Sequence, residues 1–135
     1  MRSLADLPHL RPGWHQPPGT EAATEEMMAI LDERAQEALA RVRAQYPSHA
    51  PTSVILRDCL VRAANAQHDA RVDVVSRGGG RHQALYLCSR SLAASRVIGE
   101  RVGGPERGRF SRALRYAVLV AAKRLRKTDA ATVAA

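Results

Sequence analysis

The chain has 135 residues, of which 45% are apolar, and a formal net charge of +8 at pH 7. That length can bury one modest core, or two small ones that need a partner, which excludes a large enzyme scaffold. No apolar run is as long as a bilayer span, and residues 1–6 lack the continuous apolar stretch of a signal peptide, so we expect a cytoplasmic protein with no membrane partner.

Residues 1–23 are predicted to form an extended, Pro-rich arm. Four prolines and two glycines in this segment exclude a regular helix or a central strand. Trp14, the only tryptophan, lies in the arm. It either anchors a protein partner or folds back on its own domain, and the sequence leaves both alternatives open.

The next segment, residues 24–70, is predicted to be a helical hairpin that acts as a pairing module. Thr24 can cap a helix whose apolar side chains recur at intervals of three and four as far as Val42. A second helix is expected over residues 54–66. Two helices joined by a short turn expose an apolar face, which either a second copy, in a homodimer, or the C-terminal half would cover.

Residues 71–128 are predicted to form a basic module of a short β-element and two helices. The β-prone runs 71–76 and 83–88, separated by three glycines, favour a β-hairpin. A helix beginning near His82 is the alternative for the second run. The expected fold class is therefore mainly α with a short β-element.

Two further helices are predicted after this hairpin. The first, over residues 89–98, can begin at a serine cap and ends before a Gly-rich and Pro-rich break. The second begins at the Ser111 cap and runs to about Lys127. Residues 129–135 are expected to be a disordered tail.

The charge of the chain is divided very unequally between its halves. Residues 71–135 hold 14 Arg or Lys and four acids, whereas residues 1–70 hold seven Arg or Lys and nine acids. A near-neutral half joined to a strongly basic half indicates that one part folds or pairs while the other meets a polyanion.

Catalytic and metal-binding patterns are absent from the sequence. The five histidines are scattered, with no paired spacing on a helix, and the acids of the basic half form no close pair. The glycine run 78–80 lacks the Lys-Ser/Thr of a nucleotide-binding loop. Cys59 and Cys88 lie in apolar segments and are expected to be reduced core thiols. We therefore expect no enzymatic activity and no cofactor.

A faint internal repeat relates the second helix of each half. The eight residues from Ser53 match the eight from Ser111: a capping Ser, Leu three positions later, then Arg, and a small and an apolar residue at the sixth and seventh positions after the Ser. An earlier helix precedes each, and a short apolar run precedes that helix, 27–31 in one case and 84–88 in the other. This order resembles the ribbon-helix-helix family of DNA-binding proteins, here as a tandem repeat.

The resemblance implies that two copies of the unit intertwine, that their strands pair into a ribbon, and that alternate side chains of this ribbon enter the major groove. It makes Leu85 and Leu87 core residues. The outward residues would be Glu26, Met28 and Ile30 in the first copy and His82, Ala84 and Tyr86 in the second. The sequence leaves open whether 27–31 and 82–88 are strands or helices.

The resemblance also implies that Ser111 caps a helix whose N-terminus holds a phosphate, with Arg109 as a flanking contact. The outward residues lack the Arg, Lys, Asn or Gln typical of base recognition, so we expect phosphate contacts to dominate. The predicted nucleic-acid-binding residues are Arg81, His82, Tyr86, Arg107, Arg109, Ser111, Arg112, Arg115, Lys123 and Arg124.

These observations predict a small dimeric protein that binds double-stranded DNA, as a transcription regulator or a plasmid or phage maintenance factor. The alternative is a helical adaptor or assembly protein whose basic half docks an acidic protein or RNA. For the last four basic residues of the final helix, a solubility role is as compatible with the sequence as a binding role.

Overall fold

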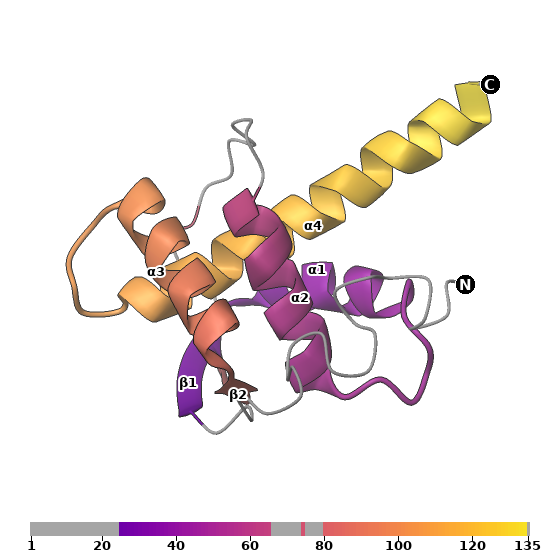
Figure 1. Ribbon diagram of the computed structural model, residues 1–135. Coiled ribbons are helices and arrows are strands. Elements are labelled where there is room, and N and C mark those ends of the chain that lie inside the picture. Colours follow the sequence, from indigo (N-terminus) through magenta and orange to yellow (C-terminus); the bar gives the residue numbers. More distant parts are fainter. Residues whose placement is uncertain (1–24, 66–73, 75–79, 135) are drawn as a thin grey trace.

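The structure, a computed structural model, describes residues 25–65, 74 and 80–134, with side chains as far as Leu125. The arm and the position of Trp14 lie outside these residues. The described elements follow the order strand, helix, helix twice (Figure 1). They are β1 (Glu25–Leu31), α1 (Glu33–Arg43), α2 (Thr52–Asn65), β2 (Arg81–Leu87), α3 (Ser89–Val102) and α4 (Arg109–Ala134).

The two strands pair with each other as an antiparallel ribbon. Met28 lies opposite Ala84 at its centre, and the register runs symmetrically from this pair to Glu25 opposite Leu87 and Leu31 opposite Arg81. Both strands alternate in burial in the same way along their seven residues. The ribbon therefore has an approximate two-fold axis through its centre, although it is formed by one chain.

The predicted β-hairpin between 71–76 and 83–88 is not seen in the described residues, since most of its first run lies outside them. The second run is a strand, as favoured, but its partner is β1. Of the first run only Val74 is described, and it lies outside any strand. The alternative helix from near His82 is also wrong. The glycines between the runs suggested a local turn, whereas the actual partner is a strand far earlier in the sequence, which no local pattern identifies.

The helix predicted to begin at Thr24 is also wrong, because residues 25–31 form β1. The α1 helix begins only after Asp32, whose Oδ1 accepts a hydrogen bond from the Ala35 N–H at 2.9 Å. Pairing with β2 therefore takes residues 25–31 out of the predicted helix, and α1 begins at the Asp32 cap instead. Ala29 and Leu31 are buried by strand alternation, and Ala35, Ala38 and Val42 by helical periodicity. The apolar positions from Met28 to Val42, which fit one helical stripe in the sequence, are therefore divided between β1 and α1.

The C-terminal helices are longer than predicted, and neither begins at its predicted serine cap, since α4 begins at Arg109, two residues before Ser111. Cys88 is the N-cap of α3, and Ser91 Oγ accepts the Cys88 N–H at 3.0 Å. The loop between α3 and α4 contains Gly103, Gly104 and Gly108, all with positive φ, which explains why α3 ends there. The α4 helix continues to Ala134, through the predicted tail.

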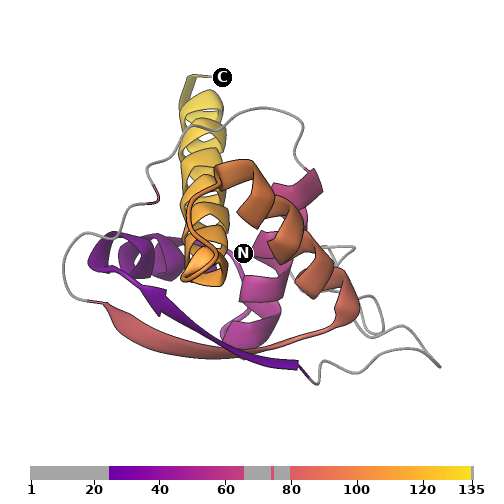
Figure 2. The ribbon, with the colours of Figure 1, turned by 90° about the vertical axis from the view of Figure 1, so that its left-hand side faces the viewer.

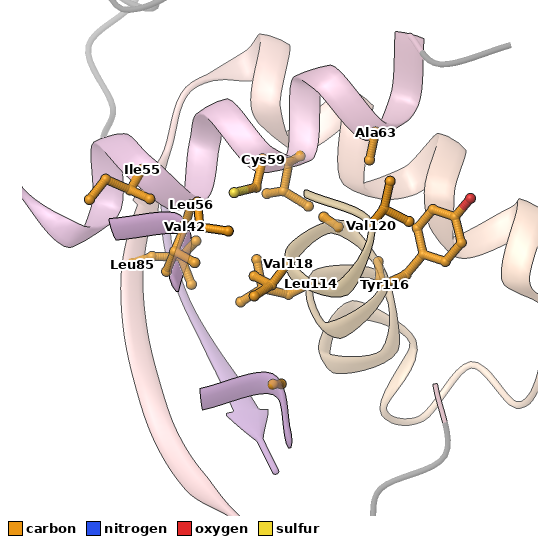
Figure 3. Packing of buried hydrophobic residues seen from close by; sticks show 14 of the residues in the cluster. Val42, Ile55, Leu56, Cys59, Ala63, Leu85, Leu114, Tyr116, Val118 and Val120 are labelled. Carbon is orange, nitrogen blue, oxygen red and sulfur yellow. The ribbon is translucent and has the colours of Figure 1, made fainter. Parts of the chain in front are cut away.

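All four described helices lie on one face of the ribbon (Figure 2). Leu85 and Leu87 point inward, as predicted, and are 0% and 1% exposed. They contribute to one core shared by both halves, with Leu56 from α2 and Leu114 from α4 at its centre (Figure 3). The helices α1 and α2 pack mainly against the C-terminal half of the same chain rather than as a hairpin against each other, so that half covers their apolar faces, which is one of the two alternatives. The homodimer stays a prediction.

The two cysteines are buried and unbonded, as expected for core thiols. Burial raises the pKa of the Cys59 thiol above its ordinary value. This side chain lies between α2 and α4 in the core (Figure 3). Its role is therefore packing, since a thiol held protonated is a poor nucleophile.

A buried carboxyl group lies on α2. Asp58 is 1% exposed, accepts a hydrogen bond from the Tyr46 hydroxyl and is 3.3 Å from Arg62 Nε. Burial raises the pKa of Asp58 from 3.8 to about 7, although Arg62 acts in the opposite direction. The folded protein therefore binds this proton more tightly than the unfolded chain does.

The register of the ribbon predicts which truncations destabilise it. Leu85→Ala removes a fully buried side chain and should lower the free energy of unfolding by about 2–5 kcal/mol. Met28→Ala truncates an outward side chain that is 54% exposed, and should change the free energy of unfolding by less than about 0.5 kcal/mol. Urea denaturation measures both. The opposite ranking would mean that the register is shifted by one residue.

The pKa of Asp58 predicts a specific pH dependence. Because the folded-state pKa is the higher one, stability is greatest below the unfolded pKa near 4 and is lost as pH rises through about 7. Asp58→Asn should remove this loss, so its stability relative to the wild type should rise between pH 4 and 7, by at most about 1.4 kcal/mol per pH unit. Denaturation at several pH values measures the difference, with Glu37→Gln, at an exposed position on α1, as control. A difference independent of pH would contradict the assignment.

Candidate nucleic-acid interface

The outward side of the ribbon is a continuous exposed surface, which we call the ribbon face. It consists of Glu26, Met28 and Ile30 from β1 and His82, Ala84 and Tyr86 from β2. These are the six outward residues that the resemblance implied. Met28, Ile30 and Tyr86 are 54%, 41% and 48% exposed, which is unusual for large apolar side chains in one small area.

The free edge of β2 is held by the start of α2. Ser53 Oγ accepts a hydrogen bond from the Tyr86 N–H at 3.3 Å, and Arg57 Nη1 donates to the Tyr86 carbonyl at 2.7 Å. Tyr86 directs both main-chain groups away from β1, so a two-stranded ribbon offers them no strand partner. Ser53 and Arg57, one helical turn apart, therefore satisfy the N–H and C=O groups of Tyr86.

The free edge of β1 is held in the same way by the start of α4. Ser111 Oγ accepts the Ile30 N–H at 3.0 Å, and Arg115 Nη1 donates to the Ile30 carbonyl at 3.0 Å. Arg115 Nε also donates to the Val74 carbonyl at 3.0 Å. We call the two arrangements the edge clamps. Each consists of the Ser and Arg of the internal repeat, and each holds the strand of the other half.

The arginines of the edge clamps are buried cations. Arg57 and Arg115 are each only 6% exposed. Burial lowers the pKa of both guanidinium groups from the ordinary value, and the nearby Asp32 carboxylate opposes this for Arg115. Guanidinium remains charged under these conditions. A positive charge therefore lies under each edge of the ribbon, beside a helix N-terminus, whose dipole has the same sign.

A second group of arginines organises the loop between α3 and α4. Arg112 donates to the carbonyls of Gly103, Pro105 and Arg107, at 3.3 Å for the first and 3.1 Å for the last. Arg109 donates to the Gly104 carbonyl at 3.3 Å. These partners are main-chain carbonyls, so the contacts fix the guanidinium groups without neutralising them.

Arg109 also depends on a glycine of α3. A Cβ atom at Gly99 would lie 2.8 Å from Arg109 Cγ, so the start of α4 approaches α3 closely at this point. Together with the loop contacts, this packing holds Arg107, Arg109 and Arg112 next to Ser111, which contacts β1. The start of α4 is therefore a rigid basic region at one edge of the ribbon.

The structure divides the predicted binding residues into distinct places. Arg81, His82 and Tyr86 are exposed on β2, and Arg107, Arg109, Ser111 and Arg112 surround the start of α4. Arg115 is committed to the edge clamp and is too buried to reach a ligand directly. Lys123 and Arg124 lie about 18 Å further along α4, which leads away from the ribbon (Figure 1).

Three structural residues were missed by the site prediction. Ser53 and Arg57 form the edge clamp on β2, and the internal repeat could have identified them, because their counterparts Ser111 and Arg115 were selected. Arg101 donates to the carbonyls of Ala63 and Ala64 at 3.0 and 2.9 Å, which caps the end of α2. No local pattern indicated this contact between distant segments.

Comparison of the chain with models of known protein families, with curated proteins and with solved structures finds no match. Within residues 25–65, 74 and 80–134, no group of three or more His, Cys, Asp or Glu side chains could hold a metal ion. The helices of this described part include none with the length and apolar character needed to cross a bilayer.

The edge clamps predict that Arg115 contributes to stability rather than to surface charge. Arg115→Met keeps an apolar stem but leaves the Ile30 and Val74 carbonyls without their donor, and each loss should cost about 1–3 kcal/mol. The control is Arg96→Met, at an exposed position on α3. Chemical denaturation measures both variants, and equal stabilities would show that Arg115 does not hold the ribbon.

Proposed function

We propose that this protein binds double-stranded DNA as a tandem ribbon-helix-helix unit contained in one chain. The observation that carries the proposal is the pair of edge clamps. They put the start of α2 along one edge of an exposed two-stranded ribbon and the start of α4 along the other. A ribbon of this kind fits the major groove, and helix N-termini beside it are suited to the flanking phosphates.

The distribution of charge supports a polyanionic ligand. Arg81 and Arg107 are exposed near the ribbon, and the described contacts of Arg109 and Arg112 are to main-chain carbonyls rather than to carboxylates. The charge of this region is therefore available to phosphates, where guanidinium groups make forked contacts. An adaptor that docks an acidic protein or RNA would use the same cations, but its binding would not depend on the ribbon.

The start of α2 differs from the start of α4 in charge. Residues 48–54 contain no Arg, Lys, Asp or Glu, whereas Arg107, Arg109 and Arg112 surround the start of α4. Phosphate contacts are therefore concentrated at the β1 edge, which α4 borders. One chain supplies both strands of the ribbon. Regulation of transcription and maintenance of a plasmid or phage are roles compatible with such a protein.

The proposal predicts salt-sensitive binding to duplex DNA that depends on particular cations. Arg81→Ala and Arg107→Ala should each weaken binding, and each lost phosphate contact should reduce the slope of log Kd against log salt by about 0.9. Arg41→Ala, an equal charge change at an exposed position on α1, should leave the slope unchanged. Fluorescence anisotropy over a salt series measures this, with single-stranded DNA and RNA as competitors. Absence of salt-sensitive duplex binding, or equal losses in all three variants, would contradict the proposal.

A further inference from the structure

The ribbon face has an apolar centre and polar ends. Met28 lies opposite Ala84 in the middle, and Ile30 extends this apolar strip along β1. At one end Glu26 lies opposite Tyr86, whose hydroxyl donates to the Glu26 carboxylate at 3.4 Å. At the other end His82 lies opposite Ile30. This surface can offer hydrogen bonds near its ends but only apolar contact at its centre.

We propose that this face recognises a single non-palindromic site in duplex DNA through the methyl groups of central thymines. The inference rests on the proposed function. Thymine is the base whose major-groove edge presents an apolar group, its C5 methyl. Against a central G·C pair, the same side chains would cover polar base edges without satisfying them, which is unfavourable.

Charge complementarity identifies DNA, rather than an apolar protein surface, as the occupant. The apolar strip is narrow and is bordered on both sides by helix starts, held there by Ser53 and Ser111. Exposed Arg81 lies at one end of the ribbon, and the basic start of α4 lies along one edge. An apolar partner would have to bury these cations without counter-charges, whereas a DNA groove brings phosphates to both sides.

We expect the DNA site to be non-palindromic because the approximate two-fold axis of the ribbon relates unlike side chains. This axis relates Glu26 to His82, Met28 to Ala84 and Ile30 to Tyr86. Every related pair differs in size, charge or hydrogen bonding. A palindromic duplex would present identical base edges to these unlike side chains, so one orientation of an asymmetric sequence binds best. One chain per site is sufficient, because both strands belong to it.

The test begins with selection of duplexes from a random-sequence library by the full chain. We expect one asymmetric consensus with thymines at its centre, bound by one chain per duplex. Deoxyuridine, which lacks only the C5 methyl, is then substituted for each central thymine. Each contacted methyl should contribute about fourfold in affinity, the equivalent of one buried methyl-sized group.

Variants of the ribbon face connect this effect to the structure. Met28→Ala and Ile30→Ala should weaken binding to the thymine site and reduce its sensitivity to deoxyuridine. The matched control is Val97→Ala, because Val97 is 45% exposed on α3, outside the ribbon. It should retain both the affinity and the full deoxyuridine effect.

The possible failures are distinguishable. Salt-sensitive duplex binding with no consensus and no deoxyuridine effect would overturn this inference and leave the proposed function intact. A palindromic consensus with two chains bound would overturn the asymmetry. Unchanged affinity and deoxyuridine sensitivity in Met28→Ala and Ile30→Ala would overturn the contact, because residues outside the apolar strip would then contact the thymine methyl groups. Absence of duplex binding would overturn the inference and the proposed function together.

Discussion

The fold depends on how a two-stranded ribbon satisfies its free edges. A lone pair of strands is marginal in water, because each strand has main-chain groups with no strand partner. Here the edge-facing N–H and C=O groups of Ile30 and Tyr86 form hydrogen bonds with Ser and Arg side chains from the second helix of the other half. The helices also cover the inner face, so the ribbon is stabilised on one side and along both edges. Of the two faces of the ribbon, the ribbon face is the one that the described helices leave exposed.

This arrangement makes the two halves interdependent. The Ser and Arg of α2 hold β2, and the equivalent residues of α4 hold β1, so neither half contains the partners for its own strand edge. The halves nevertheless differ greatly in charge, since the basic residues are concentrated after residue 70. A symmetric scaffold therefore carries an asymmetric surface. Covalent linkage allows this difference, because each half can vary independently, whereas identical subunits cannot.

Much of the fold was predictable from local patterns, but the pairing was not. The α2 helix follows from periodicity, which depends on neighbours in sequence. The inward positions of Leu85 and Leu87 are those that the family resemblance implied. The strand character of residues 27–31 stayed open, with a helix from Thr24 as the main prediction, because the same apolar positions also fit a helix that continues into α1. Only the pairing with residues 81–87, distant in sequence, decides between the two.

The candidate site shows the same limit. The internal repeat singled out Ser111 and Arg115, yet sequence alone could not separate a helix cap or a phosphate contact from the main-chain contacts that both residues make with Ile30. Basic residues look alike in sequence, whether they are exposed, as Arg107 is, or buried under a strand, as Arg115 is. Charge asymmetry therefore led to the proposal of a polyanionic ligand, while burial was needed to separate exposed basic residues from buried ones.

The central claim is that the ribbon and the two helix starts beside it form the DNA-binding surface. Amide hydrogen exchange of the full chain with and without duplex DNA measures this most directly. The account predicts slower exchange in peptides from β1, β2 and the first turns of α2 and α4, with the larger change at α4. Slower exchange confined to the distant part of α4, with the ribbon peptides unchanged, would contradict it.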